Sequence, residues 1–429
     1  MRFFHYPKNI FKLHFQMLPM LAKLNSFLSY GNLLIATGII VILKIFYIVL
    51  IQKEFVGLED FAIAQNIVAY HQYSQFINLG GTAFKLPVYP LFLSFFIWSL
   101  GNNALLGVAI VQALISFFIP LLLFRILRLF GLEKVGVLAG FLYILSPAYF
   151  LYSGIIEATN VFVPLLLLWL YFYFKIWCSK EKRMISFIIF GFVTAILFLT
   201  QVVIVPLACL MILALLIYER VSFKNFALMA CTAILFYSPW VIRNYYVFDK
   251  IIPSKTPVWQ NIYFGFTPKG QLRKDLQLIT AERDHNLYQM SDENDELAME
   301  KIYKEETLKA TQGKPQYFIK KALSNLLCLW YMPPKYVDDQ SWPVIAGRKI
   351  YVVILDLLTL ISLFFLYKKS KMVFWFSVLF FSNFSLPYMI GHAANMRFKL
   401  DFEWYQLVLV SFLLMEILAH FLSKKSDTA

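Results

Sequence analysis

Three charged side chains in the first hundred residues have the chemistry of a site that handles hydroxyl and phosphate groups. Glu59 and Asp60 are adjacent acids that follow the first apolar run, and a carboxylate held there can act as a general base toward an acceptor hydroxyl. An acid pair at a helix N-terminus, complementing the helix dipole, explains them equally well. Lys85 brings a cation that can pair with a phosphate, and an interfacial lysine is the structural alternative.

Glu157 is a stronger candidate, because it lies between two apolar runs with almost no loop between them. A carboxylate at the edge of a membrane span is costly unless it faces a wet cavity or a partner. Arg397 and Lys399, in the short turn 392–402, also suit a phosphate, although basic residues commonly flank membrane spans. These features favour a functional role for Glu157 and leave the role of the two cations open.

The stretch 238–246 marks the place where an apolar helix gives way to a long polar segment. Pro239 predicts the end of that helix, because proline cannot donate to the helical hydrogen-bond ladder. Trp240 and Tyr245 carry rings that prefer the membrane–water boundary, and the Arg243 guanidinium matches a phosphate at headgroup level. From local chemistry alone, an aromatic and basic belt that closes a span is the simpler explanation.

The composition places these residues in a membrane protein. The 429 residues are 60% hydrophobic and 15% charged, and apolar runs of transmembrane length recur along the chain. The net charge of +14 lies mostly in short loops, where it reports orientation in the membrane, so no nucleic-acid partner is expected. The four cysteines show no paired spacing, so neither a disulfide framework nor a cysteine metal site is indicated.

The apolar runs predict ten transmembrane helices, at residues 31–51, 104–124, 135–153, 156–174, 184–200, 203–218, 224–240, 345–367, 372–391 and 403–422. If the shorter run 86–100 also crossed, the first basic loop would face away from the other basic loops. It is therefore predicted to be a juxtamembrane or re-entrant helix on the outer side. Residues 184–218 are too long for one span, so a hairpin is expected at 201–206. Lys44, inside the first span, is expected to snorkel toward the interface.

The predicted fold class is an all-α polytopic membrane protein of about ten to eleven transmembrane helices, with juxtamembrane helices on the outer face. The expected regions begin with a basic cytoplasmic N-terminus, 1–30, and an N-terminal transmembrane module, 31–240, with an outer loop at 52–103. An outer loop with helices, 241–344, and a C-terminal transmembrane module with a cytoplasmic tail, 345–429, follow. Residues 291–294 and Pro315 predict the starts of two helices in the outer loop.

Five stretches together have the order and spacing of motifs in a known family. They are DFAIAQNI at 60–67, LPVYPLFL at 86–93, YSGIIE at 152–157, PWVIRNY at 239–245 with WQNIYFG at 259–265, and RFKLD at 397–401. This order resembles the GT-C integral membrane glycosyltransferases, in particular the family 39-like branch, which includes dolichyl-phosphate-mannose protein mannosyltransferases and lipid A aminoarabinose transferase. The sequence departs from the family pattern at two positions, where Asp401 replaces a proline and Phe266 replaces an asparagine. The register of the first acid also differs, so Glu54 is a third candidate for that acid besides Glu59 and Asp60.

The resemblance implies a GT-C-like bundle and a hexosyl- or pentosyltransferase that takes its sugar from a polyprenyl-phosphate donor. The acceptor would be a hydroxyl of a glycolipid, a polysaccharide or a protein, attacked with inversion. Asp60 or Glu59 would be the catalytic base, and Glu157 would hold the surroundings of the base or bind a sugar hydroxyl. The implied donor-phosphate residues are Lys85, Arg243, Tyr245, Arg397 and Lys399, and the implied substrate-binding residues are Tyr89, Asn244, Gln260 and Asn261.

The resemblance also implies a site that faces the periplasm from a bacterial inner membrane. Some relatives use a divalent metal, for which the outer acids and His71 are candidate ligands, but no ligand spacing requires one. A transporter or flippase of a lipid-linked sugar is the main alternative, and it would need charges near the bilayer midplane, where this sequence has mainly Lys44, Asp356 and Glu416. A polysaccharide polymerase or ligase and a catalytically inactive scaffold are further alternatives.

Overall fold

The computed structural model describes residues 26–179, 181, 183–219, 221–331, 342–392 and 397–426, and within these ranges the chain forms helices and no strand. The predicted basic N-terminal segment lies mostly outside the described residues, as do residues 393–396 of the predicted outer turn.

The first part of the chain forms a series of mostly apolar helices. They are α2 Tyr30–Leu50, α3 Glu59–Tyr70, α4 Val88–Leu100, α5 Ala104–Ile115, α6 Phe118–Arg128, α7 Glu133–Ile144, α8 Pro147–Tyr152, α9 Thr159–Cys178, α10 Met184–Phe198, α11 Val205–Tyr218 and α12 Phe223–Phe248. Short 3-10 turns join some of them and one lies further on: η1 Ile77–Leu79, η2 Gly101–Asn103, η3 Val202–Ile204 and η4 Lys274–Leu276.

The remaining helices form the segment predicted to be an outer loop, called the outer segment after that prediction, and a C-terminal group. The outer segment contains α13 Trp259–Phe264, α14 Ala281–Met290, α15 Glu296–Thr311 and α16 Pro315–Tyr331. The C-terminal group contains α17 Trp342–Lys369, α18 Lys371–Ile390 and α19 Arg397–Ser426.

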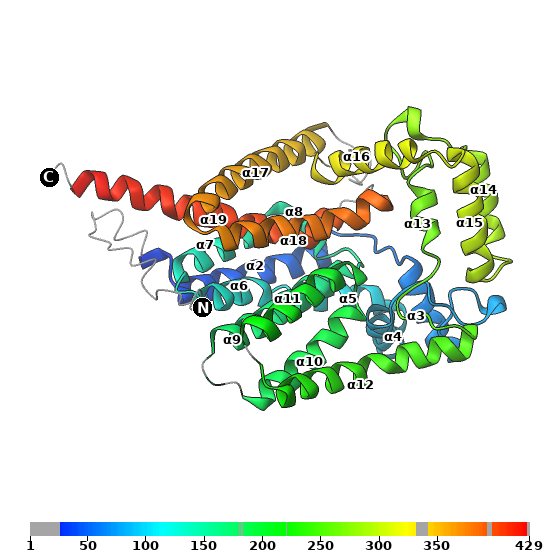
Figure 1. The fold of residues 1–429 in the computed structure, drawn as a ribbon, viewed down its shortest axis with the longest axis horizontal. Helices are drawn as coiled ribbons and strands as arrows, with labels where there is room; N and C mark the ends of the chain where they lie inside the picture. The colour runs from blue at the N-terminus through cyan, green and yellow to red at the C-terminus, as the bar shows by residue number, and fades with distance from the viewer. Residues whose placement is uncertain are drawn as a thin grey trace.

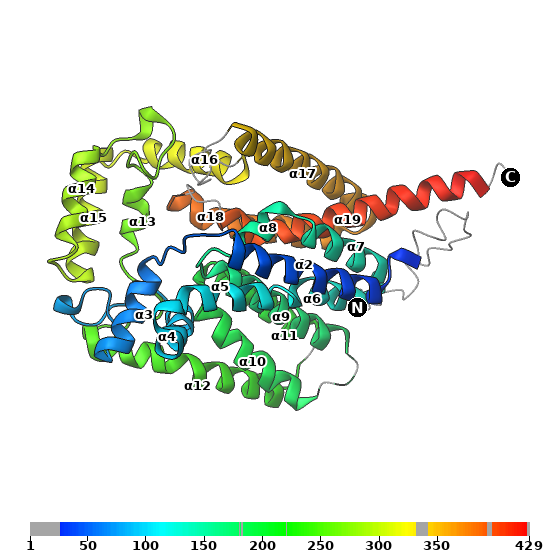
Figure 2. The ribbon, with the colours of Figure 1, turned by 180° about the vertical axis from the view of Figure 1, so that it is seen from behind.

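The long helices lie alongside one another, and α13–α15 gather at one end of the bundle (Figures 1 and 2). Helix α2 begins and α19 ends at the opposite end, while α3 lies close to α13–α15 (Figure 1). Helix α9 runs through the main apolar core, where Phe162, Leu166 and Trp169 are completely buried. Within a membrane such burial exchanges contact with lipid tails for close packing against neighbouring helices, so van der Waals contacts hold α9 to the helices around it.

The all-α polytopic class is confirmed, and the number of spans is lower than predicted. Among the described residues, seven helices are long and apolar enough to cross a membrane, or eight if a bent pair counts as one span. Residues 88–128 form one long candidate, and the predicted span 135–153 is divided at Pro147 into α7 and α8, both short. The bent pair, α10 and α11, turns by 119° at 199–201, just before the predicted turn at 201–206, and neither half is long enough to count as a span by itself, so the two separate spans predicted here are not found.

Helix α12 continues through Pro239 to Phe248, so the prediction that the helix ends at the proline is wrong. A proline removes one helical hydrogen bond, and a helix tolerates this when neighbouring groups hold the segment. Here Trp240 Nε1 donates to Ser254 O and Asn244 Nδ2 donates to Ile252 O, each at 2.9 Å. The predicted boundary at 240/241 falls inside a helix, and the division into modules stays a proposal.

The outer segment is helical, as predicted, with one shifted start and one unpredicted helix. Helix α15 begins at Glu296 because Asp295 caps it, accepting from Leu297 N and Ala298 N at 2.8 Å each. The predicted start at 291–294 was therefore early, and α14 was not predicted. Helix α16 begins at Pro315, as expected.

Lys44 does not snorkel to the interface, so that prediction is wrong. Its side chain is buried, and Nζ donates to Ser116 Oγ at 2.9 Å. The ring of Tyr143 lies 5.9 Å from Nζ. Snorkelling requires a free path to water, and packing of α2 against α5 and α7 encloses the lysine instead.

Candidate active site

The acids and the lysine singled out at the start of the chain meet at one place. Glu59 and Asp60 occupy the first turn of α3, and Lys85 reaches them from the loop before α4. Lys85 Nζ lies 3.4 Å from Glu59 Oε2 and 3.6 Å from Asp60 Oδ2. The Asp60 side chain is 13% exposed and that of Glu59 is 47% exposed. Asp60 is therefore the acid enclosed within the site, and Glu59 lies at its rim.

The charges of Lys85 and of its neighbouring acids shift the pKa values of Lys85 and Glu59. Burial disfavours the ammonium of Lys85, but the carboxylates of Asp60 and Glu59 together outweigh burial and raise the pKa of Lys85. In turn, the positive charge of Lys85 lowers the pKa of Glu59 against the opposing effect of burial. Lys85 and Glu59 are consequently both ionised at neutral pH.

A second ion pair lies beside the first. The Arg397 guanidinium, at the start of α19, donates from Nη1 to Glu157 Oε2 just before α9. The charges of Arg397 and Glu157 both act on Lys85, so the two pairs are neighbours. Glu157 has the partner that its position requires, and its carboxylate holds Arg397 in place.

Asp401 supports this second pair from one turn further along α19. Its carboxylate is 1% exposed and accepts from Thr159 Oγ1 at 2.9 Å and from Tyr388 OH at 3.2 Å. A buried carboxylate is tolerated when hydroxyl donors satisfy it in this way. The residue that departs from the family pattern thus ties α9, α18 and α19 together behind Arg397.

Lys255 is a member of the site that the sequence did not reveal. It lies in the loop after α12, half-buried, and no hydrogen bond or ion pair with another described residue engages its ammonium. Burial, together with the positive charges of Lys85 and Arg397, lowers the pKa of Lys255 to about 8, and Asp60 only partly offsets this. An anion placed among these three cations would relieve their mutual repulsion. A lysine between two prolines in a polar loop carries no periodic signal that could have found it.

Tyr89 lies beside the site, and its predicted role in binding substrate stays a prediction. It is 2% exposed and its hydroxyl donates to Gln112 Oε1 at 2.8 Å. The charges of Asp60 and Glu157 both act on this hydroxyl. Tyr89 therefore closes the site on the side of α4 and α5.

Arg243 is not directed at this cluster. Its Nη1 donates to Thr82 O at 2.6 Å and its Nη2 to Tyr73 O at 2.8 Å. The guanidinium also lies over the rings of Tyr73 and Trp240, with its carbon 5.1 and 5.4 Å from their centroids. It lies at the same end of the bundle as Asp60, but its donors are used on two backbone carbonyls and on Asn244 Oδ1, at 2.9 Å.

The other predicted binding residues lie on α12 and α13. Asn244 is completely buried and holds Ile252 O, while the Tyr245 side chain is half exposed. On α13, Gln260 hydrogen-bonds the Tyr303 side chain and Asn261 lies against Gly391. These contacts give Asn244, Gln260 and Asn261 roles in fixing loops, and a role in binding substrate stays a prediction.

Lys399 points into the C-terminal group. Its side chain is completely buried, and Nζ lies 2.7 Å from Asp356 Oδ1 and donates to Trp330 O at 3.1 Å. The structure therefore separates the two cations of the RFKLD motif: Arg397 joins the cluster, and Lys399 pairs with α17.

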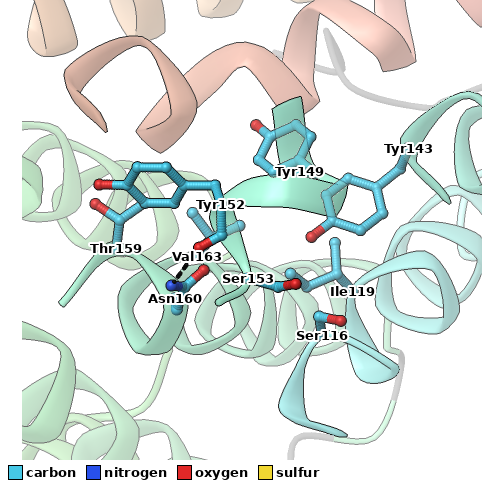
Figure 3. Close-up of a pocket in the computed structure, with 9 residues that line it drawn as sticks. All are labelled: Ser116, Ile119, Tyr143, Tyr149, Tyr152, Ser153, Thr159, Asn160 and Val163. Carbon is cyan, nitrogen blue, oxygen red and sulfur yellow. Dashed lines mark hydrogen bonds between the residues drawn. The ribbon is translucent and has the colours of Figure 1, made fainter. Parts of the chain in front are cut away.

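A small cavity lies among the side chains of α8, the start of α9 and Ser116, with about 10 Å³ of room for a water-sized molecule. Figure 3 shows hydroxyl groups of Tyr152, Thr159 and Ser116 among its lining side chains. Asn160 Nδ2 donates to Tyr152 O at 3.0 Å across one wall (Figure 3). Polar walls and this size suit a single water.

Metal ligands do not gather in the described part of the chain: no group of three or more His, Cys, Asp or Glu side chains there is placed to hold an ion. Glu59 and Asp60 are directed at Lys85, and His71 lies at the opposite end of α3.

Comparisons with known proteins agree with the predicted resemblance. The family model of the dolichyl-phosphate-mannose-protein mannosyltransferases matches residues 85–242, from Lys85 to the middle of the PWVIRNY motif. This match confirms the resemblance to the family 39-like GT-C glycosyltransferases. The crystal structure of ArnT from Cupriavidus metallidurans bound to undecaprenyl phosphate is similar at a TM-score of 0.40 and 11% identity, covering 90% of this chain and 78% of that one. No curated protein sequence matches the chain.

Proposed function

We propose that this chain is an integral membrane glycosyltransferase that moves a sugar from a polyprenyl-phosphate donor to a hydroxyl of a glycolipid, a polysaccharide or a protein. The family match over residues 85–242 supports the donor class, because the family is named for a dolichyl-phosphate-linked sugar. The site chemistry supports it independently.

One observation carries the proposal. Asp60 lies 3.6 Å from Lys85, at a place where Lys255 and Arg397 also bring positive charge. A carboxylate can take the proton of an acceptor hydroxyl, and converging cations can stabilise a phosphate as it leaves. Residues for both parts of a glycosyl transfer from a lipid phosphate, deprotonation of the acceptor and stabilisation of the leaving phosphate, thus lie within one small region.

In the proposed reaction, the acceptor oxygen bonds to the anomeric carbon while the bond from that carbon to the donor phosphate oxygen breaks. The electron pair of the broken bond stays on the polyprenyl phosphate, the acceptor proton passes to Asp60, and the anomeric configuration inverts. Lys85 and Lys255 stabilise the charge on the departing phosphate, and preorganised donors of this kind contribute roughly 3 kcal/mol each. Arg397, fixed by Glu157, adds to the positive field.

The proposed orientation follows from the ends of the bundle. The site lies near α3, away from the start of α2 and the end of α19 (Figure 1). If the basic short loops are cytoplasmic, this end faces the periplasm of a bacterial inner membrane. The donor would then enter from the outer leaflet.

The test uses the purified full-length protein with a radiolabelled polyprenyl-phosphate sugar pool and a panel of glycolipid, polysaccharide and protein acceptors. The proposal expects label transfer by the wild type and its loss in Asp60→Asn. Transbilayer movement of the labelled lipid without transfer would instead identify a flippase. Transfer that survives both Asp60→Asn and Glu59→Gln would overturn the assignment of the base.

A further inference from the structure

The loop that carries Lys85 into the site is held from two sides by hydrogen bonds to side chains outside the charge cluster, and each of these two sets of hydrogen bonds is called a grip. From α15, the Glu296 carboxylate accepts from Ala83 N, with its two oxygens at 3.0 and 3.2 Å, and from the Thr82 hydroxyl. The first turn of α15 is therefore anchored to the backbone directly before residues 84 and 85.

The second grip comes from α12. Arg243 donates to both Thr82 O and Tyr73 O, so one guanidinium holds the two ends of the loop 73–82 together. At Gly81 the approach is so close that an added Cβ would lie 2.6 Å from Arg243 Nη2. A side chain at this position would push the guanidinium away, so glycine is required for the grip.

The backbone held by the two grips is hydrogen-bonded to the segments that carry Lys85 and Lys255. The Tyr73 hydroxyl donates to Lys85 O at 2.9 Å, and Thr82 N donates to Tyr73 O at 3.0 Å. On the other side, Thr256 N donates to Ala83 O at 3.1 Å, which joins the loop carrying Lys255 to the same backbone. The positions of the two lysines therefore depend on residues 73–83.

We propose that Glu296 and Arg243 are positioning residues, which act through the loop 73–84 to hold Lys85 where a donor phosphate binds. This inference rests on the proposed function for the identity of the ligand. It gives α15 of the outer segment a role in the site, although no side chain of α15 belongs to the charge cluster.

The electrostatics of Glu296 suggest how to test it cleanly. Burial raises the pKa of Glu296 to about 7, against the opposing effects of the Thr82 and Ala83 hydrogen bonds and of Arg243. Tyr73 is the other titratable group that faces it. Because a neutral side chain with an acceptor oxygen is compatible with this position, Glu296→Gln keeps the grip and Glu296→Ala removes it.

The experiment measures binding of undecaprenyl phosphate to the full-length protein by wild type, Glu296→Ala, Glu296→Gln and the control Glu305→Ala, which removes an exposed acid from the same helix. Loss of the grip is expected to weaken binding about tenfold in Glu296→Ala, with little change in the other two. The same comparison is repeated in a Lys85→Ala background, where the effect of Glu296→Ala should shrink to the part that acts through Lys255, because Glu296 and Lys85 act in series.

A second readout does not depend on the lipid: the rate at which an amine reagent labels Lys85, followed by mass spectrometry, should rise in Glu296→Ala and not in Glu305→Ala. An unchanged labelling rate, or a binding loss that persists undiminished without Lys85, would overturn the inference. A wild type that fails to bind the lipid would count against the proposed function, and the labelling rates would still decide whether the grip positions Lys85.

Discussion

Two groups of buried charges in the described part of the chain differ in how completely each charge is paired. In the C-terminal group, Arg348 and Glu403 form a two-bond pair at 2.7 and 3.1 Å. Lys399 and Asp356 lie 2.7 Å apart, and Gln406 also donates to Asp356. In the cluster at the end of the bundle, the contacts of Lys85 are looser, at 3.4 and 3.6 Å, and Lys255 has no ion-pair partner among the described residues.

The difference distinguishes charges that hold helices together from charges that are available to a ligand. A buried ion pair repays its desolvation only with close geometry and additional hydrogen bonds, which the pairs between α17 and α19 have. Cations held near one another without matched partners are costly, and such an arrangement is typical of a binding site. The comparison therefore supports placing the donor phosphate at Lys85 and Lys255, and not at Lys399.

The largest expected effect is on chemistry in the cluster. Replacing Asp60 by Asn removes the proton acceptor while preserving size, so the rate of sugar transfer should fall about 10²–10⁴-fold. Binding of undecaprenyl phosphate should be retained, because the cations remain. Radiolabel transfer and lipid binding are measured on the same preparation, with Glu305→Gln as a control of equal charge change. A loss of lipid binding equal to the loss of transfer would contradict the role of Asp60.

The next effect is on stability in the C-terminal group. Replacing Arg348 by Met leaves Glu403, whose side chain is 0% exposed, without its partner and should destabilise the fold by about 3–5 kcal/mol. Replacing both residues, as Arg348→Met with Glu403→Leu, should recover most of that loss. Thermal unfolding in detergent measures both. If the single and double variants are equally unstable, the pair is not the closed structural unit described here.

Lys255→Met should show the opposite behaviour to Arg348→Met. Removing a half-buried cation from beside Lys85 and Arg397 relieves repulsion, so the unfolding temperature should stay the same or rise. The affinity for undecaprenyl phosphate should fall about tenfold, the scale of one hydrogen bond to a charged group. Equilibrium binding and thermal unfolding are compared with those of Lys250→Met, an exposed lysine earlier in the same loop. A drop in stability without a drop in affinity would place Lys255 with the structural charges.

The smallest effect is a pH dependence that comes from the same lysine. Its lowered pKa, about 8, means that the ammonium is lost as the pH rises through that value in the unliganded protein. Affinity for the lipid phosphate should therefore be greatest below pH 8 and decline severalfold above it. Arg keeps its charge in this range, so Lys255→Arg should flatten the profile. A wild-type affinity that is constant between pH 7 and pH 9 would count against Lys255 as a phosphate ligand.

The sequence predicted those parts of the site that short stretches specify. Acids at a helix start and a lysine before the next helix were sufficient to predict Glu59, Asp60 and Lys85, and the structure joins them. The need of Glu157 for a partner was also predictable, since an isolated carboxylate at a span edge is costly. The helical class followed from the apolar runs.

The sequence could not predict the parts that depend on long-range contacts. A guanidinium fits two backbone carbonyls as well as it fits a phosphate, so nothing near Arg243 in sequence shows that its partners are Thr82 and Tyr73. Lys255 reaches the site because α12 holds its loop through Trp240 and Asn244. The excess of predicted spans has a local origin instead, because breaks such as that at Pro147 divide a continuous apolar run.

The most direct test is a cryo-electron microscopy structure of the full-length protein with undecaprenyl phosphate bound. We predict that the phosphate lies within hydrogen-bonding distance of the Lys85 and Lys255 ammonium groups, beside Asp60, with Arg243 still on the loop carbonyls. A phosphate bound at Lys399 or Arg348, or one that displaces Arg243 from the loop while leaving Lys85 on its acids, would contradict the account.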